Sequence, residues 1–191
     1  MQLGWERHFR HIVIPAWRQY LSAERQLTEA AKLSDQEAVE IARYDALREG
    51  GAASMYLHHF IEIVVNERPN FLPDDIREIK DAPSRLGSTR KWLAEACFML
   101  RGDTLCADVE LLRQVADALK HAALTRENLQ IEGNDAVLIT ASSYGKGAYG
   151  AGKYGGGPTV WVLAKSGERQ LTSILRNVID AWHRCLDWNL P

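Results

Sequence analysis

Apolar side chains recur every three to four residues over most of this 191-residue chain, and this spacing is the feature that most constrains its fold. Residues spaced in this way fall on one face of an α-helix, so the pattern predicts amphipathic helices that pack against one another. We therefore expect a mainly α protein, a helical bundle of about five helices. The five longer helices are predicted over residues 16–33, 34–66, 88–100, 104–124 and 172–188, and a short helix is expected over 74–80.

Local signals predict where these helices begin, bend or stop. Ser34, followed three residues later by Glu37, is a capping-box pattern at the start of the second helix. Gly50 and Gly51 each lower helix propensity by about 1 kcal/mol in the middle of that helix, so they predict a kink or a close crossing with another helix. Pro83 is expected to interrupt the helical pattern that follows.

The helical spacing stops near residue 133 and resumes at residue 172. Residues 135–142 are too short and too β-branched for a helix and predict a strand, and 159–164 and 168–171 predict two more. We therefore expect a small antiparallel β-sheet of three short strands inserted before the last helix. The chain is expected to be a single domain over 1–191, with a helical bundle (1–133), a β-hairpin insertion (134–171) and a carboxyl-terminal helix that completes the bundle (172–191).

A repeat rich in glycine and tyrosine joins the first two predicted strands, and each of its three five-residue units begins with Tyr-Gly. Two phosphate-loop patterns occur within it, but Pro158 and a strand follow instead of a helix, so neither predicts a nucleotide site. We expect the loop over 144–157 to hold a protein or RNA partner, or a second subunit, by stacking and positive charge. The alternative is that its tyrosines pack back on the sheet. The predicted binding residues are Tyr144, Lys146, Tyr149, Lys153 and Tyr154.

Charge is nearly balanced overall but uneven along the chain. The 23 basic and 25 acidic side chains give a net charge of −2, which argues against binding nucleic acid by bulk electrostatics. Residues 34–72 have a balance of −4, whereas residues 136–167 carry three lysines and no acidic residue. No apolar run is long enough to cross a membrane, and no secretion signal is recognised. We expect a cytoplasmic protein with no membrane partner.

The three cysteines are widely spaced, with no Cys-x-x-Cys and no matching histidine spacing. Cys97, Cys106 and Cys185 all fall within helical apolar patterns. Buried, reduced thiols are therefore expected there, in preference to a metal or redox site. No cofactor is expected.

Polar residues at helical spacing suggest a possible metal site. Arg113, Asp117 and His121 are each four residues apart and share a polar helix face, and His58 and Glu62 have the same spacing on an earlier helix. If the two faces met, a divalent metal could be held by two histidines and two carboxylates. The alternative is a solvated face with weak ion pairs. The predicted metal ligands are His58, Glu62, Asp117 and His121.

On the last predicted helix, Arg176 and His183 are seven residues apart and therefore lie on one side, with Asp180 between them. This spacing, with the polar Asn177 after the arginine, resembles the R-x4-6-H motif of the HEPN family of helical-bundle domains, which are often ribonucleases. The resemblance implies a metal-independent endoribonuclease whose site forms across a homodimer. In it, His183 would move protons, Arg176 would stabilise the scissile phosphate and Asp180 would orient them.

Residues 113–121 together with the Gly-Tyr hairpin are also similar to a group of uncharacterised bacterial proteins, a resemblance that implies no function. Three functions therefore compete. We favour a self-associating binding or assembly protein that presents the 144–157 loop, and the alternatives are a HEPN-like ribonuclease and a metal-binding bundle.

Overall fold

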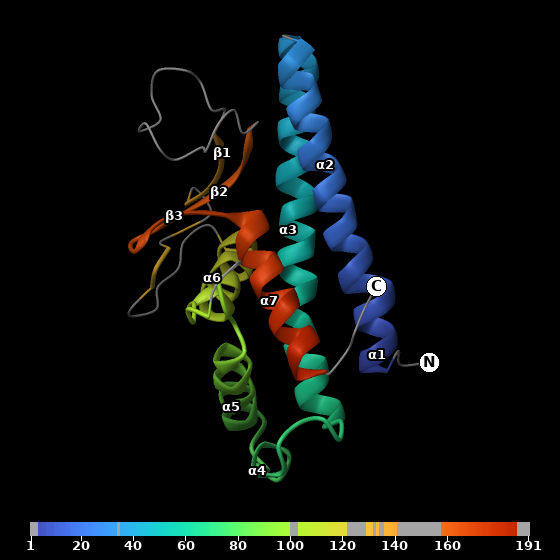
Figure 1. Cartoon of the computed structure of the whole chain (residues 1–191), viewed down its shortest axis with the longest axis vertical. Coiled ribbons are helices and arrows are strands. Elements are labelled where there is room, and N and C mark those ends of the chain that lie inside the picture. The colour runs from blue at the N-terminus through green and yellow to red at the C-terminus, as the bar shows by residue number, and fades with distance from the viewer. Residues whose placement is uncertain are drawn as a thin grey trace.

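The fold is described from a computed structural model, which describes residues 4–33, 35–99, 103–121, 129–131, 133, 136–140 and 158–186. Helices account for most of these residues, and a small antiparallel sheet precedes the last helix (Figure 1). The predicted mainly helical class with a sheet before the last helix is therefore confirmed.

The first helical stretch begins earlier than predicted, at Trp5 instead of residue 16. It consists of α1 (Trp5–His8), the π-helical turn η1 (Phe9–Val13) and α2 (Ile14–Leu33). Pro15 has no N–H with which to continue the usual helical hydrogen bonds, and the π-helical turn immediately before it accommodates this loss without ending the helix. The π-helical turn also divides the stretch, so the chain has more helical elements than the five or so expected.

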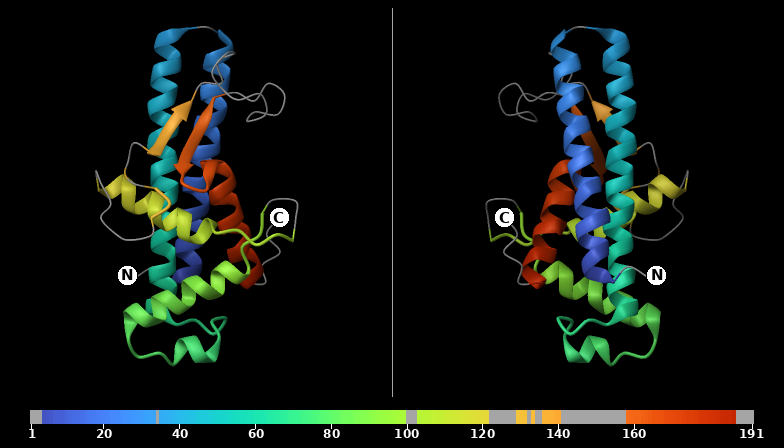
Figure 2. Two further views of the ribbon diagram at one scale, coloured as in Figure 1. Left: turned by 90° about the vertical axis from the view of Figure 1, so that its left-hand side faces the viewer. Right: turned by 90° about the vertical axis from the view of Figure 1, so that its right-hand side faces the viewer.

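Helix α3 (Gln36–Glu67) runs antiparallel to α2, and the two form a long hairpin that extends beyond the rest of the molecule (Figures 1 and 2). Its amino-terminal cap is Asp35, whose Oδ1 accepts the N–H of Ala38 at 3.2 Å. The cap predicted at Ser34 is corrected accordingly, and Ser34 itself lies outside the described residues.

The glycine pair in α3 marks a close helix crossing, as predicted. A Cβ placed on Gly50 would lie 2.9 Å from Leu171 Cδ2 and 3.0 Å from Tyr20 Cε2, whereas one on Gly51 would lie 3.4 Å from Leu119 Cδ1. Only a residue without a side chain lets α2 and the start of the last helix approach α3 this closely.

The proline predicted to interrupt a helix instead lies inside one. After the short α4 (Asp74–Arg77), helix α5 (Ala82–Glu95) begins with Pro83 in its first turn, where a missing N–H costs nothing. The Asp81 carboxylate caps this helix by accepting the N–H of Ser84 at 2.8 Å. The predicted start at residue 88 is therefore corrected to Ala82.

Helix α6 (Asp108–Lys120) is shorter than the predicted 104–124. The residues before it are extended, because Leu105 pairs with Phe98 in an antiparallel bridge. Residues 122–124 lie outside the described residues. The buried positions of α6 recur at helical spacing, as the apolar stripe predicted, and include Val109, Leu112, Val115 and Ala116.

The sheet consists of β1 (Val137–Thr140), β2 (Thr159–Ala164) and β3 (Gly167–Gln170), which pair in that order and antiparallel. Val160 and Val162 of β2 are fully buried, and β2 contacts α2, α3 and α7 (Leu171–Cys185). The sheet is thus held along one side of the α2–α3 hairpin, as both views in Figure 2 show.

Helix α7 packs against α3, α5 and α6. The ring of its Trp182 lies edge-on to Phe60 of α3 with 4.8 Å between centroids, and Phe60 in turn lies 4.9 Å from Phe9. Large aromatic side chains therefore fix which face of α7 is buried and which face is left at the surface.

Candidate functional site

Helix α7 carries the predicted ribonuclease residues on its outward side. Arg176 is exposed and Asp180 is partly exposed, whereas the His183 ring packs edge-on against Phe9 at 5.8 Å. Burial lowers the pKa of His183, and the negative charge of Asp180 partly opposes this. His183 Nε2 has no hydrogen-bond partner within the described part of the chain. The lowered pKa keeps the imidazole neutral near pH 7, and its unbonded Nε2 is buried.

Asn177, which follows the arginine in the motif, points the other way and is buried. Its Nδ2 donates to Asp108 Oδ2 at 2.7 Å, and the same carboxylate oxygen accepts from Arg169 Nη2 at 2.8 Å. The three residues come from α7, α6 and β3, so this network locks the sheet to two helices. We refer to Asp108, Arg169 and Asn177 as the Asp108 clamp. Asn177 therefore belongs to the clamp and not to the exposed face of α7.

The four predicted metal ligands do not converge. Among the described residues, which include all four, no group of three or more His, Cys, Asp or Glu side chains is placed to hold a metal ion. Glu62 lies 2.8 Å from His59 Nδ1, Asp117 accepts from Arg113 Nη1 at 3.2 Å, and His121 is exposed beyond the end of α6. The carboxylates are thus engaged with basic side chains.

His58 is the one predicted ligand that is deeply buried. Burial and the positive charge of Arg90 lower its pKa to about 4, although Asp117 and Glu62 oppose the shift. Side chains of α6 and of α3 thus approach each other at His58. Arg113 pairs with Glu110 and Asp117 of its own helix α6.

The predicted binding residues Tyr144, Lys146, Tyr149, Lys153 and Tyr154 lie outside the described residues. The strands on either side of their loop are described, with β1 ending at Thr140 and β2 beginning at Thr159. The structure therefore describes the base of this loop, where β1 ends and β2 begins.

That base is fixed to α2 by one carboxylate that sequence reasoning missed. Glu24 Oε1 accepts from Tyr20 Oη at 2.8 Å, from the Val160 N–H at 3.3 Å and from the Thr159 hydroxyl, while its Oε2 accepts from the Thr172 hydroxyl. Burial and the Glu24 charge raise the pKa of Tyr20 far above its usual value. We refer to these residues as the Glu24 junction.

A signal for this junction exists in the sequence. Glu24 follows Tyr20 by four residues and precedes Leu27 by three, so it falls beside the buried stripe of α2, where an apolar residue is expected. A carboxylate at such a position needs hydrogen-bond donors from elsewhere in the fold.

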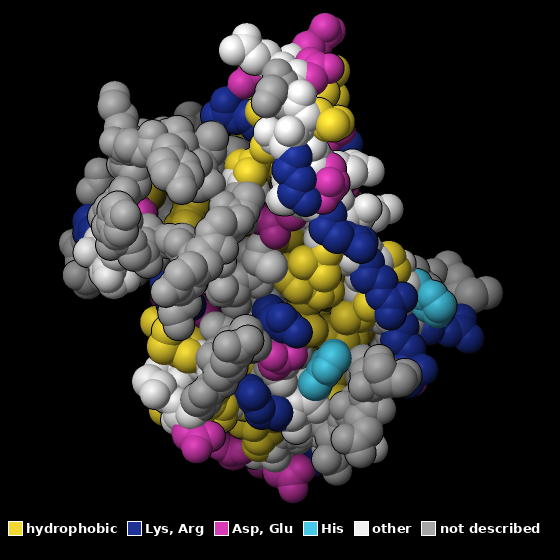
Figure 3. Space-filling view, turned by 45° about the horizontal axis from the view of Figure 1, so that its top comes forward, with side chains coloured by type: hydrophobic (Ala, Val, Ile, Leu, Met, Phe, Trp, Pro, Cys, Tyr) yellow, Lys and Arg dark blue, Asp and Glu magenta, His cyan; other side chains and the backbone are white. Residues whose placement is uncertain are grey.

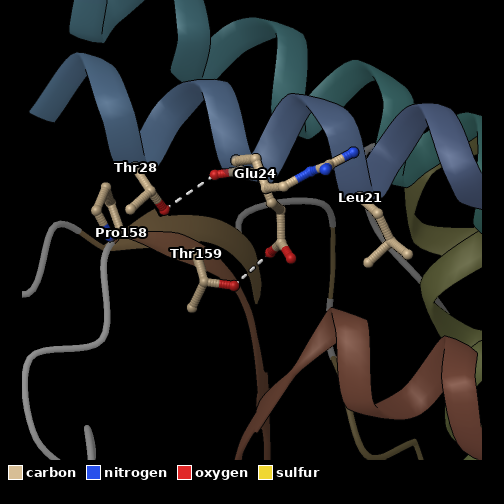
Figure 4. Close-up of a pocket in the computed structure, with 6 residues that line it drawn as sticks. Leu21, Glu24, Thr28, Pro158 and Thr159 are labelled. Atoms are coloured by element: carbon tan, nitrogen blue, oxygen red, sulfur yellow. Dashed lines mark hydrogen bonds between the residues drawn. The ribbon is translucent and has the colours of Figure 1, made fainter.

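The Glu24 junction borders an open pocket of about 540 Å³ between α2 and the start of β2 (Figure 4). Figure 4 shows the Glu24 carboxylate pointing across this pocket to Thr159, while Thr28 Oγ1 bonds the Glu24 backbone carbonyl at 3.0 Å. The pocket therefore combines apolar walls with polar groups already held by each other. It is lined by Leu21, Glu24, Arg25, Thr28, Pro158 and Thr159.

The free end of the α2–α3 hairpin exposes large apolar side chains. Leu33 is 77% exposed, Ile41 58% and Tyr44 71%. Figure 3, in which this end comes forward, shows apolar side chains among acidic and basic ones there. We refer to these three residues as the hairpin tip.

Comparisons with protein-family models, with curated proteins and with solved structures gave no match. In the part of the chain that the structure describes, no helix is both long and apolar enough to cross a membrane. The functional argument therefore depends on the geometry of the chain itself.

Proposed function

We propose that the chain is a binding and assembly protein that forms a homo-oligomer through the hairpin tip and the Gly-Tyr loop. The observation that carries this proposal is the exposure of Leu33, Ile41 and Tyr44 at the projecting end of the α2–α3 hairpin. Grouped apolar side chains on a protruding surface favour association, because contact with a partner removes their area from water.

The pocket and the base of the Gly-Tyr loop adjoin the hairpin tip. Thr28, which lines the pocket, precedes Leu33 by five residues, or about 7.5 Å along α2. Pro158, the residue after the loop, lines the same pocket. The Glu24 junction holds that base in place before a partner arrives, which reduces the ordering cost of binding.

Charge favours a second copy of this chain as the partner. Residues 34–72, which contain most of the tip, have a charge balance of −4, and residues 136–167, which contain the loop, have a balance of +3. Each copy carries both segments, so a two-fold symmetric pair can place the acidic segment of each copy against the basic segment of the other.

Sedimentation velocity over a range of protein concentrations tests this proposal. We expect an oligomer that weakens as salt is raised, because screening reduces the attraction between the two segments. Replacing both Ile41 and Tyr44 by Glu should give a monomer. The matched control is Tyr56→Glu, since Tyr56 is another exposed tyrosine of α3, twelve residues from Tyr44.

A chain that is monomeric at every concentration would contradict the proposal, as would a Tyr56→Glu variant that dissociates as readily as the tip variant. Replacing residues 145–157 by a short turn tests the loop separately. This variant should retain apolar association through the tip and lose most of the salt dependence.

A metal-independent ribonuclease is the second candidate, and it is favoured by the exposed face of α7. Arg176 and Asp180 reach the surface there, and the partly exposed His183 is neutral because its pKa is lowered, while its Nε2 is buried and has no partner within the described structure. An arginine and a neutral histidine on one face suit phosphodiester cleavage without metal.

Cleavage of a single-stranded RNA in the presence of EDTA tests this candidate. Arg176→Ala and His183→Ala should each lower the rate at least about a hundredfold, whereas the exposed His59→Gln should leave it unchanged. Activity that persists in both variants, or no cleavage by the unmodified chain, would rule it out.

A further inference from the structure

Two of the cysteines lie directly opposite each other in the connection between α5 and α6. The chain doubles back there, with backbone hydrogen bonds from Met99 N–H to the Thr104 carbonyl at 2.9 Å and from Cys106 N–H to the Cys97 carbonyl at 3.0 Å. The Sγ atoms of Cys97 and Cys106 are 3.5 Å apart. The expectation that both thiols sit inside helices is corrected, because each lies in an extended segment between them.

This backbone arrangement is suited to a disulfide. Opposed residues on antiparallel strands have Cα atoms about 5.5 Å apart when they are hydrogen-bonded to each other. Disulfides join residues whose Cα atoms are about 4.4 to 6.8 Å apart. The two sulfur atoms can therefore bond after side-chain rotation, without a rearrangement of the backbone.

The two thiols occupy unequal environments. Cys97 is fully buried, whereas Cys106 is partly exposed. The hydrogen bond from the Cys97 thiol lowers the pKa of Cys106, and the same bond, together with burial, raises the pKa of Cys97. Cys106 is thus the more accessible of the two sulfurs and the one that ionises more readily, and Cys97 is the buried thiol that lies beside it.

Neighbouring side chains support the same assignment. Asn177 Nδ2 points at Cys106 Sγ from 3.8 Å and can donate to a thiolate there. The Asp108 carboxylate opposes the thiolate, but Arg169 lies 2.8 Å from that carboxylate and balances its charge. The surroundings therefore provide donors to Cys106 and a counter-charge to the nearest acid.

We propose that Cys97 and Cys106 form a redox-active dithiol that a hydroperoxide oxidises to a disulfide. The Cys106 thiolate attacks the terminal peroxide oxygen, so an S–O bond forms, the O–O bond breaks, and the alkoxide or hydroxide takes up a proton. Cys97 sulfur then attacks the sulfur of the Cys106 sulfenic acid, so the S–S bond forms, the S–O bond breaks, and the leaving hydroxide takes the Cys97 proton to become water. Two thiols lose two electrons in all, and the hydroperoxide is reduced to an alcohol or water and one further water.

Peptide mapping of the unmodified chain tests this proposal without any variant. The reduced protein is treated with one equivalent of hydrogen peroxide at pH 7, alkylated and digested with trypsin without a reductant. Cleavage after Lys91, Arg101 and Arg113 separates the two cysteines into peptides 92–101 and 102–113. We expect these peptides to be joined by a disulfide, with Cys185 still alkylated.

Variants identify the attacking sulfur. Cys97→Ser should accumulate a sulfenic acid on Cys106 that reacts with dimedone, and Cys106→Ser should be inert to one equivalent of peroxide. Cys185→Ser is the matched control, because burial raises the pKa of this partly buried thiol to about 11. Cys106 should react about tenfold faster than Cys185. Absence of the joined peptides, or equal oxidation of Cys106 and Cys185, would overturn the proposal.

Discussion

The Glu24 junction and the Asp108 clamp attach the same small sheet to the helices, and they do so in opposite environments. Glu24 borders an open pocket and accepts from hydroxyl groups and a backbone N–H. Asp108 is 0% exposed and is held by the guanidinium of Arg169 and the amide of Asn177.

The difference follows from the cost of burying charge. A fully buried carboxylate requires an opposite charge and good hydrogen bonds, so the Asp108 clamp serves the architecture. A carboxylate beside solvent can be satisfied by neutral donors, because it keeps part of its hydration. We therefore infer that the Asp108 clamp stabilises the fold. The Glu24 junction holds the base of the Gly-Tyr loop against α2, close to the hairpin tip.

The largest effect is expected at the clamp. Asp108→Asn leaves the Arg169 charge without its partner and should lower the free energy of unfolding by about 3 kcal/mol. Urea unfolding followed by circular dichroism measures this loss. Asp103→Asn, at an exposed position, is the control and should change stability by less than about 0.5 kcal/mol. Equal losses in the two variants would show that the Asp108 clamp does not stabilise the fold.

A smaller effect is expected at the junction. Glu24→Gln retains one acceptor oxygen but turns an NH2 group toward hydroxyl and N–H donors. Urea unfolding should therefore show a free energy of unfolding that is lower by about 2 kcal/mol. The comparison with the exposed Glu29→Gln controls for loss of a charge on α2. If Glu24→Gln proved as stable as the unmodified chain, Glu24 would not fix the base of the loop.

The helix crossing between the two regions gives a third prediction. A methyl group on Gly50 would lie too close to Leu171 and Tyr20. Gly50→Ala should therefore lower the free energy of unfolding by about 1 to 2 kcal/mol, although alanine has a better helix propensity than glycine. Gly87→Ala, in α5, has nothing within 4 Å of the new methyl group. It should be neutral or stabilising, and thermal unfolding of both variants measures the contrast.

The smallest effect is expected at His58, a buried histidine that, unlike Asp108, has no ion-pair partner among the described contacts. His58 is faced by Arg90 of α5, Asp117 and Lys120 of α6 and Glu62 of its own helix, and its pKa is lowered to about 4. A base with a lowered pKa in the folded state contributes stability that is complete above its unfolded pKa of about 6.5 and is lost as the pH falls toward 4.

The loss should reach about 1 kcal/mol at pH 5.5. Urea unfolding at pH 7.5 and pH 5.5 should show this drop in the unmodified chain and a smaller drop in His58→Leu. The exposed His59→Gln serves as control and should behave as the unmodified chain does. An equal drop in all three would show that His58 does not titrate as described.

The helices were predictable from the sequence because apolar spacing is a local property. The stripe of α6 and the crossing at Gly50 both follow from residues within one helix. Helix ends were less predictable. Pro83 was expected to interrupt a helix although it lies in the first turn of α5, and the predicted start at residue 16 missed the helical residues from Trp5 onward.

The site residues were less accessible to sequence reasoning because their partners are distant in the chain. Glu24 meets Thr159 across 135 residues, and Asn177 meets Asp108 across 69. The facing of Cys97 and Cys106 depends on a reversal between two helices that helical periodicity does not show. Spacing alone predicted that Arg176, Asp180 and His183 share one side of α7, because this depends on residues of a single helix.

Hydrogen exchange at two protein concentrations, one well below and one well above the midpoint of association, tests the central claim most directly. If the hairpin tip forms the interface, backbone amides of residues 28–44 should gain protection at the higher concentration, while those of residues 176–184 should not change. Protection gained on α7 with residues 28–44 unchanged would contradict the account and place the interface beside Arg176 and His183.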